Sequence, residues 1–243
     1  MILSVQKAMH ILAVLSNGKN RPVSLQEISK KTGYPKPTCV HILQTLCHDG
    51  YVIRQSHAAG YTLGPSLYHL TRYGPYEQEL IALCRPVMRW MERKSGATVV
   101  LSVIQNKRKF IIAHADTEQN LLAEHPSIRT DDIYRTATGR AILAWMEPRE
   151  VQAIWEKYGA PPEGHWEAVT TLEELAEALK QLRKQEVITS TDGKNVGFAC
   201  PLFRGEDCIG AIGLAWKGSS PEEKLPRILI RGTKELLRRL NYE

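Results

Sequence analysis

The stretch SLQEISKKTGYPKPTCVHILQTLCHDGYV, residues 24–52, decides the fold of the first third of this chain. Ser24 followed three residues later by Glu27 has the spacing of a capping box. In that motif the serine hydroxyl accepts a hydrogen bond from a free backbone amide at the start of the helix. The glutamate side chain accepts a second one from the backbone amide of the serine. The pattern predicts a short helix that ends at Thr32-Gly33, because glycine commonly follows the last turn of a helix.

A second helix is expected after a turn at Tyr34-Pro35. It should run from about Pro37, since proline suits the first turn of a helix, to about His48, where Asp49-Gly50 ends it. Its apolar stripe has helical spacing and consists of Ile42, Leu43 and Leu46, with Cys39 near it. Two helices joined by a tight turn that contains glycine indicate a helix-turn-helix.

The flanking residues complete a small domain. A helix with apolar residues at helical spacing precedes the quoted stretch, with Ser4 as its expected N-cap and Asn17-Gly18 as its expected end. Two short strands follow, Tyr51–Arg54 and Gly60–Leu63, and form a hairpin around a polar loop. Three helices and a hairpin predict a winged helix-turn-helix, whose third helix enters the major groove of double-stranded DNA.

The distribution of charge supports a polyanionic partner for this segment. Residues 1–72 contain eight Lys and Arg against two acids, whereas residues 73–243 contain 24 basic and 24 acidic residues. The whole net charge of +6 therefore lies in the first third. A basic module joined to a neutral body is typical of proteins that bind nucleic acid.

Ten residues are candidates for contact with DNA. Lys36 and Arg54 are expected at phosphates, and Thr38, His41 and Gln44 at base edges. The full set is Ser24, Gln26, Lys36, Pro37, Thr38, Val40, His41, Gln44, Thr45 and Arg54.

The remaining two-thirds of the chain alternate between helical and strand patterns, which predicts an α/β or α+β sandwich. A short helix at Ser66–Arg72, broken at Gly74-Pro75, is the expected linker. Helices are then expected at residues 80–95, 138–145, 149–157, 172–184 and 222–240. Strands are expected at residues 97–104, 109–115, 196–203 and 208–216, with a further one at Leu121–Ala123.

Thr136-Ala137-Thr138-Gly139-Arg140-Ala141 is the most informative stretch of this part. Small residues open a helix there, so backbone amides and the positive end of the helix dipole face one point, which suits a carboxylate or a phosphate. The glycine spacing and the lysine of a P-loop are missing. A tightly packed helix start without any ligand explains the small residues equally well.

Several of these stretches resemble the IclR family of bacterial transcriptional regulators. Residues 35–46 with residues 50–52 resemble its recognition helix and wing, and Tyr61–Pro65 resembles the return to its linker helix. Thr136–Ala141 resembles the Thr-Ala-x-Gly-Arg-Ala motif of its effector domain, and residues 197–203 and 211–213 resemble later strands of that domain.

The resemblance implies an α+β protein with three parts. These are a winged helix-turn-helix DNA-binding domain over residues 1–65, a linker helix over 66–75, and a GAF-like α/β effector-binding and oligomerisation domain over 76–243. It also implies a small-molecule effector, a homodimer or dimer of dimers, and an operator with twofold symmetry. No cofactor is expected.

Departures from the family pattern affect the expected contacts with DNA and with the effector. The family usually has serine where Pro37 stands and arginine where His41 stands, so the half-site sequence cannot be taken from relatives. Relatives that bind small oxo-acids place hydroxyl side chains on the last strand, where this chain has Gly213 and Ala215.

The effector pocket is expected at the start of the helix over residues 138–145. A polar end made by amides and threonine hydroxyls would face an apolar wall, which favours a carboxylate with an apolar or aromatic body. Arg140 belongs to it only if its side chain turns inward, and a solvent-facing side chain is an equal alternative. The candidate residues are Leu121, Leu122, Thr136, Ala137, Thr138, Gly139, Arg140, Cys200, Gly213 and Ala215.

Three alternatives stay open at this point. The large domain of a DNA-binding regulator would serve oligomerisation alone. A thiol enzyme would combine Cys200 with His114 and Asp116, although no glycine-rich elbow surrounds the cysteine. A metal sensor would use a set of side chains on one helix whose spacing does not match a closed zinc site, namely Cys39, His41, Cys47 and His48. We expect no enzyme and no metal.

The five cysteines include no Cys-x-x-Cys pair, and the apolar runs are shorter than the ~20 residues of a membrane span. The first residues lack the pattern of a secretory signal. The expectation is therefore a cytoplasmic protein with reduced thiols and no membrane contact.

Overall fold

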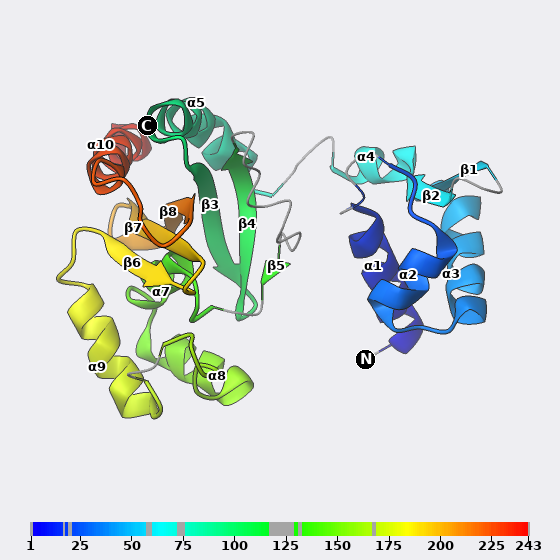
Figure 1. Cartoon of the computed structure of the whole chain (residues 1–243), viewed down its shortest axis with the longest axis horizontal. Helices are drawn as coiled ribbons and strands as arrows, with labels where there is room; N and C mark the ends of the chain where they lie inside the picture. The colour runs from blue at the N-terminus through cyan, green and yellow to red at the C-terminus, as the bar shows by residue number, and fades with distance from the viewer. Residues whose placement is uncertain are drawn as a thin grey trace. The chain divides into compact units, whose positions relative to one another are not determined.

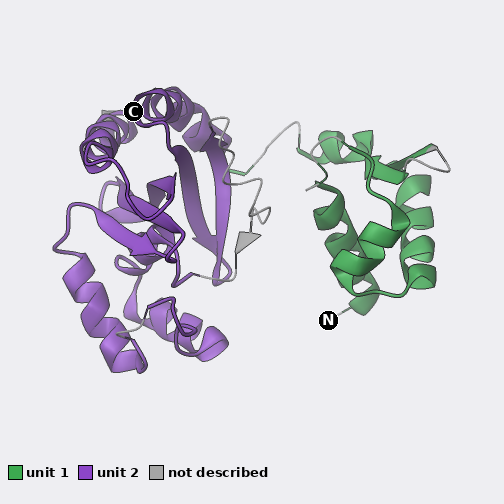
Figure 2. Cartoon of the chain, viewed as in Figure 1, with its two compact units in different colours: residues 1–76 green, residues 77–243 purple. Residues whose placement is uncertain are grey.

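The computed structural model describes residues 2–16, 18, 21–56, 60–71, 76–116, 129–130, 133–166 and 169–242. For Ser56, Arg129, Thr130 and Tyr242 it describes the backbone alone. The chain forms two compact units, residues 1–76 and 77–243 (Figure 2). The first is mostly helical, and the second is built on a six-stranded sheet (Figure 1).

The first unit is a three-helix domain with a hairpin. Its helices α1, α2 and α3 span Leu3–Ser16, Leu25–Thr32 and Lys36–His48, and strands β1 (Val52–Ser56) and β2 (Gly60–Leu63) are antiparallel. Helix α4 (Pro65–Thr71) follows the hairpin. The core between these elements consists of Ile11, Leu15, Val23, Ile28, Cys39, Leu43, Leu46 and Val52. The predicted winged helix-turn-helix is confirmed in its element order.

The turn between α2 and α3 is held by side chains on both sides of it. Gly33 has a φ of 72°, a left-handed conformation that glycine adopts without strain, and its N–H donates to the Ser29 carbonyl at 2.9 Å. The Ser29 hydroxyl donates to the Tyr34 carbonyl at 2.7 Å. These contacts fix the direction in which α3 leaves α2.

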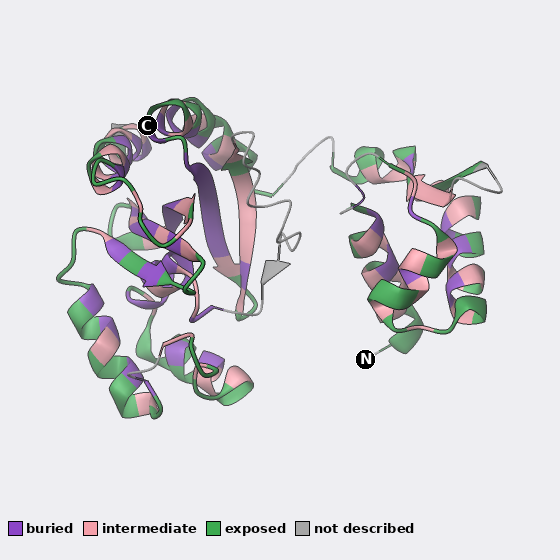
Figure 3. Cartoon of the chain, viewed as in Figure 1, coloured by how far each residue is buried: buried purple, intermediate pink, exposed green. Residues whose placement is uncertain are grey.

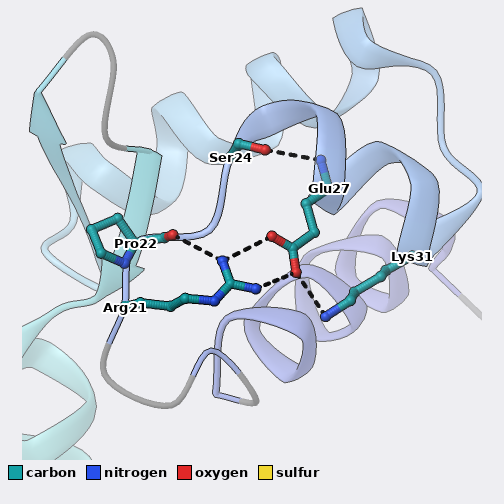
Figure 4. A network of polar contacts seen from close by, with 5 residues as sticks. All are labelled: Arg21, Pro22, Ser24, Glu27 and Lys31. Carbon is teal, nitrogen blue, oxygen red and sulfur yellow. Dashed lines mark hydrogen bonds and ion pairs between the residues drawn. The ribbon is translucent and has the colours of Figure 1, made fainter.

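Two predicted helix caps differ from the structure. Ser4 lies inside α1, which begins at Leu3, so it is not an N-cap. Ser24 does cap α2, accepting the Glu27 N–H at 3.2 Å, but the Glu27 carboxylate does not complete the box (Figure 4). It binds the Arg21 guanidinium through two bonds of 2.8 and 3.0 Å and Lys31 Nζ at 2.9 Å. Charge-assisted bonds to two cations are stronger than one bond to a backbone amide.

The second unit contains the following elements in chain order: α5 (Gln78–Ser95), β3 (Thr98–Gln105), β4 (Arg108–Ala115), β5 (Arg129–Thr130), α7 (Ala137–Leu143), α8 (Pro148–Tyr158), α9 (Leu172–Leu182), β6 (Ile188–Thr191), β7 (Asn195–Arg204), β8 (Asp207–Lys217) and α10 (Leu225–Tyr242). The strand order is β5-β4-β3-β8-β7-β6, and all neighbours are antiparallel. The predicted combination of a helix-turn-helix with a C-terminal domain of mixed helices and strands is confirmed.

Helices cover both faces of this sheet, which makes the central strand β3 buried along most of its length (Figure 3). Helices α5 and α10 pack together over one face, where they contact Leu101 and Cys200. Helices α7, α8 and α9 lie on the other side, where Ala199 and Ala211 belong to a second apolar cluster. Successive strand residues therefore face opposite layers, as the pleat requires.

Strand β6 was not expected from the sequence. Its residues alternate between buried and exposed, but the buried positions are Ile188 and Ser190, so the pattern carries one apolar residue only. The expected strand at Leu121–Ala123 lies outside the described residues, as do Arg72 and Gly74-Pro75. Within the described ranges, no helix is both long and apolar enough to cross a membrane.

Candidate nucleic-acid interface and ligand cavity

Helix α3 presents a polar face away from the core of the first unit. Cys39, Leu43 and Leu46 are buried beneath it. The exposed members of the predicted set are Lys36, Pro37, His41, Gln44 and Thr45. Positions 37, 41, 44 and 45 share one side at helical spacing. Pro37 removes an N–H that the first turn of a helix leaves unpaired in any case.

The other predicted DNA contacts lie around this face or at its margin. Thr38 and Val40 are half-buried, and Ser24 and Gln26 are exposed at the start of α2. Arg54 is exposed on β1, where its guanidinium lies over the ring of Tyr61, its partner across the hairpin, at 6.0 Å from the ring centroid.

The two acids of the first 72 residues are each paired with a neighbouring side chain. Arg21 and then Lys31 lower the pKa of Glu27 to about 2 through hydrogen bonds. Asp49 lies 2.7 Å from Nδ1 of His48. Two cations pair with the single Glu27 carboxylate, so this group of three side chains keeps a net positive charge beside α2.

The second unit contains a cavity of about 200 Å³ between the start of α7 and the sheet. Threonine, lysine and serine side chains give it polar walls, and β3, β7 and β8 supply apolar ones. Five of the ten predicted effector residues line it: Thr136, Ala137, Thr138, Gly213 and Ala215. Leu121 and Leu122 lie outside the described residues.

Lys109 is the main functional candidate that sequence reasoning missed. It lines the cavity from β4 and is 2% exposed. Its Nζ donates to the Thr136 hydroxyl at 2.9 Å and lies 3.5 Å from the Thr138 hydroxyl. The run Asn106-Lys107-Arg108-Lys109 resembles a solvated turn in sequence. The signal that could have revealed it is the alternation of side chains along the strand after the turn, because this alternation points Lys109 toward the interior.

Gly139 does not face the cavity, contrary to the prediction. Its N–H donates to the Thr136 hydroxyl at 3.2 Å, which caps α7. A Cβ at this position would lie 2.0 Å from the Ile133 carbonyl oxygen. Glycine is therefore needed for the chain before α7 to pack against the helix. Because α7 has seven residues and this amide is already bound, the positive charge at the cavity comes from Lys109 more than from the helix.

Arg140 is neither in the cavity wall nor directed to open solvent. Its Nε donates to the Tyr134 carbonyl at 2.7 Å, and a terminal nitrogen donates to the His165 carbonyl. The guanidinium lies 4.5 Å from the ring centroid of Trp166. The prediction of Arg140 as an effector contact is therefore wrong for this cavity, and the side chain joins α7 to residues on both sides of it.

Cys200 is also misplaced in the prediction, since its side chain lies on the opposite face of the sheet, toward α5 and α10. The thiol donates to the Glu186 carbonyl at 3.3 Å, and burial raises its pKa to about 11. His114 lies on β4, and β3 and β8 separate that strand from β7 by three strand spacings, ~14 Å in all. The imagined Cys-His-Asp arrangement is therefore not formed.

The absence of a hydroxyl side chain at position 213 has a steric cause. A Cβ on Gly213 would lie 2.6 Å from Cγ2 of Thr138 and 2.8 Å from the Phe198 carbonyl oxygen. The methyl group of Thr138 takes the space that a side chain on β8 would need. As for the metal-sensor alternative, no three His, Cys, Asp or Glu side chains of the described part gather to hold a metal ion.

Comparison with known proteins gives two family matches. The model described as bacterial transcriptional regulator IclR C-terminal matches residues 76–220, and the IclR helix-turn-helix domain matches residues 4–56. HTH-type transcriptional regulator KdgR of Escherichia coli is 28% identical over 213 residues, which cover 87% of this chain and 79% of KdgR. XynR of the same organism is 24% identical, covering 88% of this chain and 86% of XynR.

Solved structures agree with this fold. An IclR homologue of Microbacterium hydrocarbonoxydans, solved in complex with 4-hydroxybenzoate, has a TM-score of 0.75 at 16% identity and covers 99% of this chain and 100% of its own. IclR of Thermotoga maritima has a TM-score of 0.67 at 19% identity, with each chain fully covered. The curated relatives are regulators of transcription and not enzymes. With the helix-turn-helix, the mixed C-terminal domain and matches to both halves of the chain, this protein belongs to the IclR family of bacterial DNA-binding transcriptional regulators.

Proposed function

We propose that a small carboxylate effector binds in the cavity of the second unit and changes the affinity of the first unit for operator DNA. The observation that carries the proposal is a cavity with a buried lysine and two threonine hydroxyls at one end and apolar walls from three strands. A preformed hollow with few convergent polar groups is typical of small-molecule sites. The Microbacterium homologue bound to 4-hydroxybenzoate, a carboxylate, supports the same assignment here.

The proposed DNA contacts are those of the exposed face of α3 and of the wing. Lys36 and Arg54 are assigned to phosphates, and His41 and Gln44 to base edges, because they project from the core at the positions where a recognition helix meets DNA. Ser24, Gln26, Pro37, Thr38, Val40 and Thr45 complete the interface at its edges.

The proposed assembly is a homodimer or a dimer of dimers. Helix α1 exposes apolar side chains that a monomer leaves in water, among them Leu3 at 60% and Met9 at 57% exposure. Tyr68 and Leu70 on α4 are each 67% exposed. A second copy covering these residues would bury them and set the distance between two recognition helices. The proposed domain ranges are 1–65, 66–75 and 76–243.

The proposed mechanism is a shift of population. An effector that binds one arrangement of the two domains more tightly than another favours that arrangement, and the DNA affinity follows. The change in DNA affinity is limited by the difference between the free energies with which the effector binds the two arrangements.

The test is a cavity-filling variant of the full chain. Ala215 lines the cavity from β8, so Ala215→Phe should occupy it without removing a polar group. Carboxylates that raise the melting temperature of the wild type should have no effect on this variant. Ala82→Phe, at an exposed position of α5, is the control. Carboxylates that stabilise Ala215→Phe as well as the wild type would place the effector elsewhere. If no carboxylate stabilises the wild type, the proposal of a carboxylate effector is overturned.

A further inference from the structure

Positive charge is concentrated in one of the two helical layers of the second unit. Residues 73–243 contain equal numbers of basic and acidic residues. Helices α5 and α10, which pack together over one face of the sheet (Figure 1), nevertheless contain nine Lys and Arg against three Glu. Helices α7, α8 and α9 on the other side contain four against five acids. We call the exposed Lys and Arg side chains of α5 and α10 the basic layer.

Arg85, Arg89 and Arg93 form a row on α5, because residues four positions apart project from the same side of a helix. The row is about 12 Å long at a rise of ~1.5 Å per residue. All three side chains are exposed, and none is paired with a carboxylate among the residues that the structure describes. Like charges at this spacing repel each other and destabilise a helix. The stability of the fold therefore does not account for the row.

Helix α10 continues the positive surface. Arg227 and Arg231 are exposed, and neither has a carboxylate partner within the described ranges. The Arg231 guanidinium lies 5.3 Å from the ring centroid of Trp90, a contact that orients the cation and leaves its charge in place. Glu235 is the only acid of α10, and it is bound by two arginines of the next helical turn. It is therefore not the partner of Arg227 or Arg231.

Two grooves run along α5 and give this surface a concave form. The first has a volume of about 520 Å³ and lies between α5 and α10, where Trp90 and Arg231 line it. The second has a volume of about 560 Å³ and lies between α5 and β4, where the arginine row lines it. Its two acids are Glu92 and Asp116, and Asp116 already accepts the Thr98 hydroxyl at 2.5 Å. Arginines along a helix between two grooves suit an extended anionic partner.

The chemistry of the basic layer favours the phosphate groups of duplex DNA. Seven of the nine basic residues of the two helices are arginine, whose planar group binds a phosphate through two hydrogen bonds. Duplex DNA carries one negative charge per ~1.7 Å of its axis, so a row of about 12 Å faces several phosphates. Because the chain belongs to a family of DNA-binding regulators, duplex DNA is a partner that it meets.

An acidic helix of a second copy is the alternative partner, and α9 is the acidic helix of the second unit. Its glutamates are engaged locally. The Glu174 carboxylate accepts the N–H groups of Thr170 and Thr171 at 2.7 and 3.1 Å, and Glu177 accepts the Gln181 side-chain amide at 2.7 Å. Such a helix offers less free negative charge than a phosphate backbone, so the observations favour DNA.

We infer that the basic layer is a second DNA-contact surface of this chain, apart from α3 and the wing, and that it binds phosphates of duplex DNA without reading the bases. Phosphate contacts carry no sequence information. This surface therefore raises the affinity for every duplex and makes binding more dependent on salt. The inference does not depend on the effector cavity, because no residue of the basic layer lines it.

The experiment measures the affinity of the full chain for a random-sequence duplex of about six helical turns, ~60 base pairs, by fluorescence anisotropy over a range of salt concentrations. The test variant replaces Arg85, Arg89 and Arg93 together by glutamine. It should lower the affinity at least about tenfold, and it should lower the slope of log K against log salt by about 2–3, at ~0.9 per phosphate contact. Its melting temperature should be no lower than that of the wild type, because the repulsion along α5 is removed.

Matched variants separate direct contact from net charge. Arg149, Lys180 and Lys184 are exposed in or next to α8 and α9, and their joint replacement by glutamine removes the same charge from the other helical layer. This control should leave the slope unchanged. Replacing the arginine row by three lysines retains the charge, so it should keep the slope and lower the affinity several-fold, because lysine cannot form the two-bond contact. Arg89→Gln alone should lower the slope by about one.

A lower slope in the triple glutamine variant of α5, with a flat response in the control, supports the inference. Equal slopes for the wild type and this variant would overturn it. An equal decrease in the control would also overturn it, because net charge alone would then explain the effect. An unchanged slope with a smaller mass in light scattering would instead assign the basic layer to contact between copies of the chain. If the triple variant melts at a lower temperature than the wild type, the slope of Arg89→Gln decides by the same criteria.

Discussion

Replacing Gly213 by serine tests how α7 packs on the sheet at the floor of the cavity. Gly213→Ser installs the type of hydroxyl side chain that oxo-acid-binding relatives were expected to have on the last strand. In this chain the new Cβ would lie 2.6 Å from Thr138 Cγ2 and 2.8 Å from the Phe198 carbonyl oxygen. Both contacts are shorter than Cβ atoms tolerate, so the helix or the strand must move.

The expected loss in the free energy of unfolding is the cost of overpacking, about 1–3 kcal/mol for carbon atoms added to a close-packed region. For a unit of this size that corresponds to a decrease in melting temperature of roughly 2–12 °C. Thr138→Ser removes the Cγ2 methyl and should cost less than Gly213→Ser. The double variant should therefore recover part of the loss, but not all of it, because the backbone oxygen of Phe198 remains in place.

The assay is tryptophan fluorescence during thermal and urea unfolding of the full chain. All five tryptophans lie in the second unit, at positions 90, 145, 155, 166 and 216, so the signal reports that unit alone. A Gly213→Ser variant as stable as the wild type would refute the steric argument. So would a double variant whose loss equals the sum of the two single losses, because the two sites would then be independent.

Three further predictions concern the first unit. Lys36→Ala should weaken binding to all duplex sequences and reduce the salt dependence of binding by about one phosphate contact. Gln44→Ala should instead change the sequence preference by about 1–3 kcal/mol at one base pair. Selection from a random duplex pool, combined with salt titrations, distinguishes the two effects. Glu27 has its pKa lowered to about 2 by Arg21 and Lys31, so it should stabilise this unit above pH ~4.5 and lose that effect as the pH falls toward 2. The stability difference between wild type and Glu27→Gln should shrink over this range, by no more than about 1 kcal/mol because the pair is largely solvated, and a constant difference would contradict it. Met9→Glu should shift the oligomeric state toward the monomer in light scattering, and an unchanged mass would exclude α1 from the interface.

The helix-turn-helix was predictable because its signals are local. Gly33 ends α2, proline opens α3, and the buried stripe of α3 has helical spacing, so each element is specified by residues within a few positions of it. The charge asymmetry pointed to the partner without any knowledge of the fold. Where local reasoning failed, as at Glu27, the competing partner Arg21 lies outside the motif.

The cavity was predicted in place but only partly in composition. Thr136–Ala141 marked the start of α7 and gave three lining residues, Thr136, Ala137 and Thr138, whereas Gly213 and Ala215 followed from the resemblance on the last strand. Lys109 comes from a strand 27 positions before Thr136 and is brought there by pairing of β4 with β3, which no short stretch encodes. Cys200 was misplaced because the face that a strand residue presents depends on the register of β7.

Gly139 and Arg140 illustrate a third limit. Both belong to the same six-residue stretch as Thr136 and Thr138, yet one packs against the Ile133 carbonyl and the other against Trp166. A stretch of consecutive residues at a helix start points in several directions, so proximity in sequence does not show which members face a ligand.

The central claim is that one ligand site and one DNA site in this chain are energetically coupled. The most direct test is reciprocity: a carboxylate that changes the DNA dissociation constant by some factor must have its own dissociation constant changed by the same factor when DNA is bound. Both should be measured on the full chain, with a selected duplex and the carboxylate that most raises the melting temperature of the wild type, by anisotropy and by calorimetry. The account predicts equal factors of about 5–150 in the wild type and a factor of one in Ala215→Phe. A wild type whose DNA affinity does not respond to any acid that it binds would contradict it.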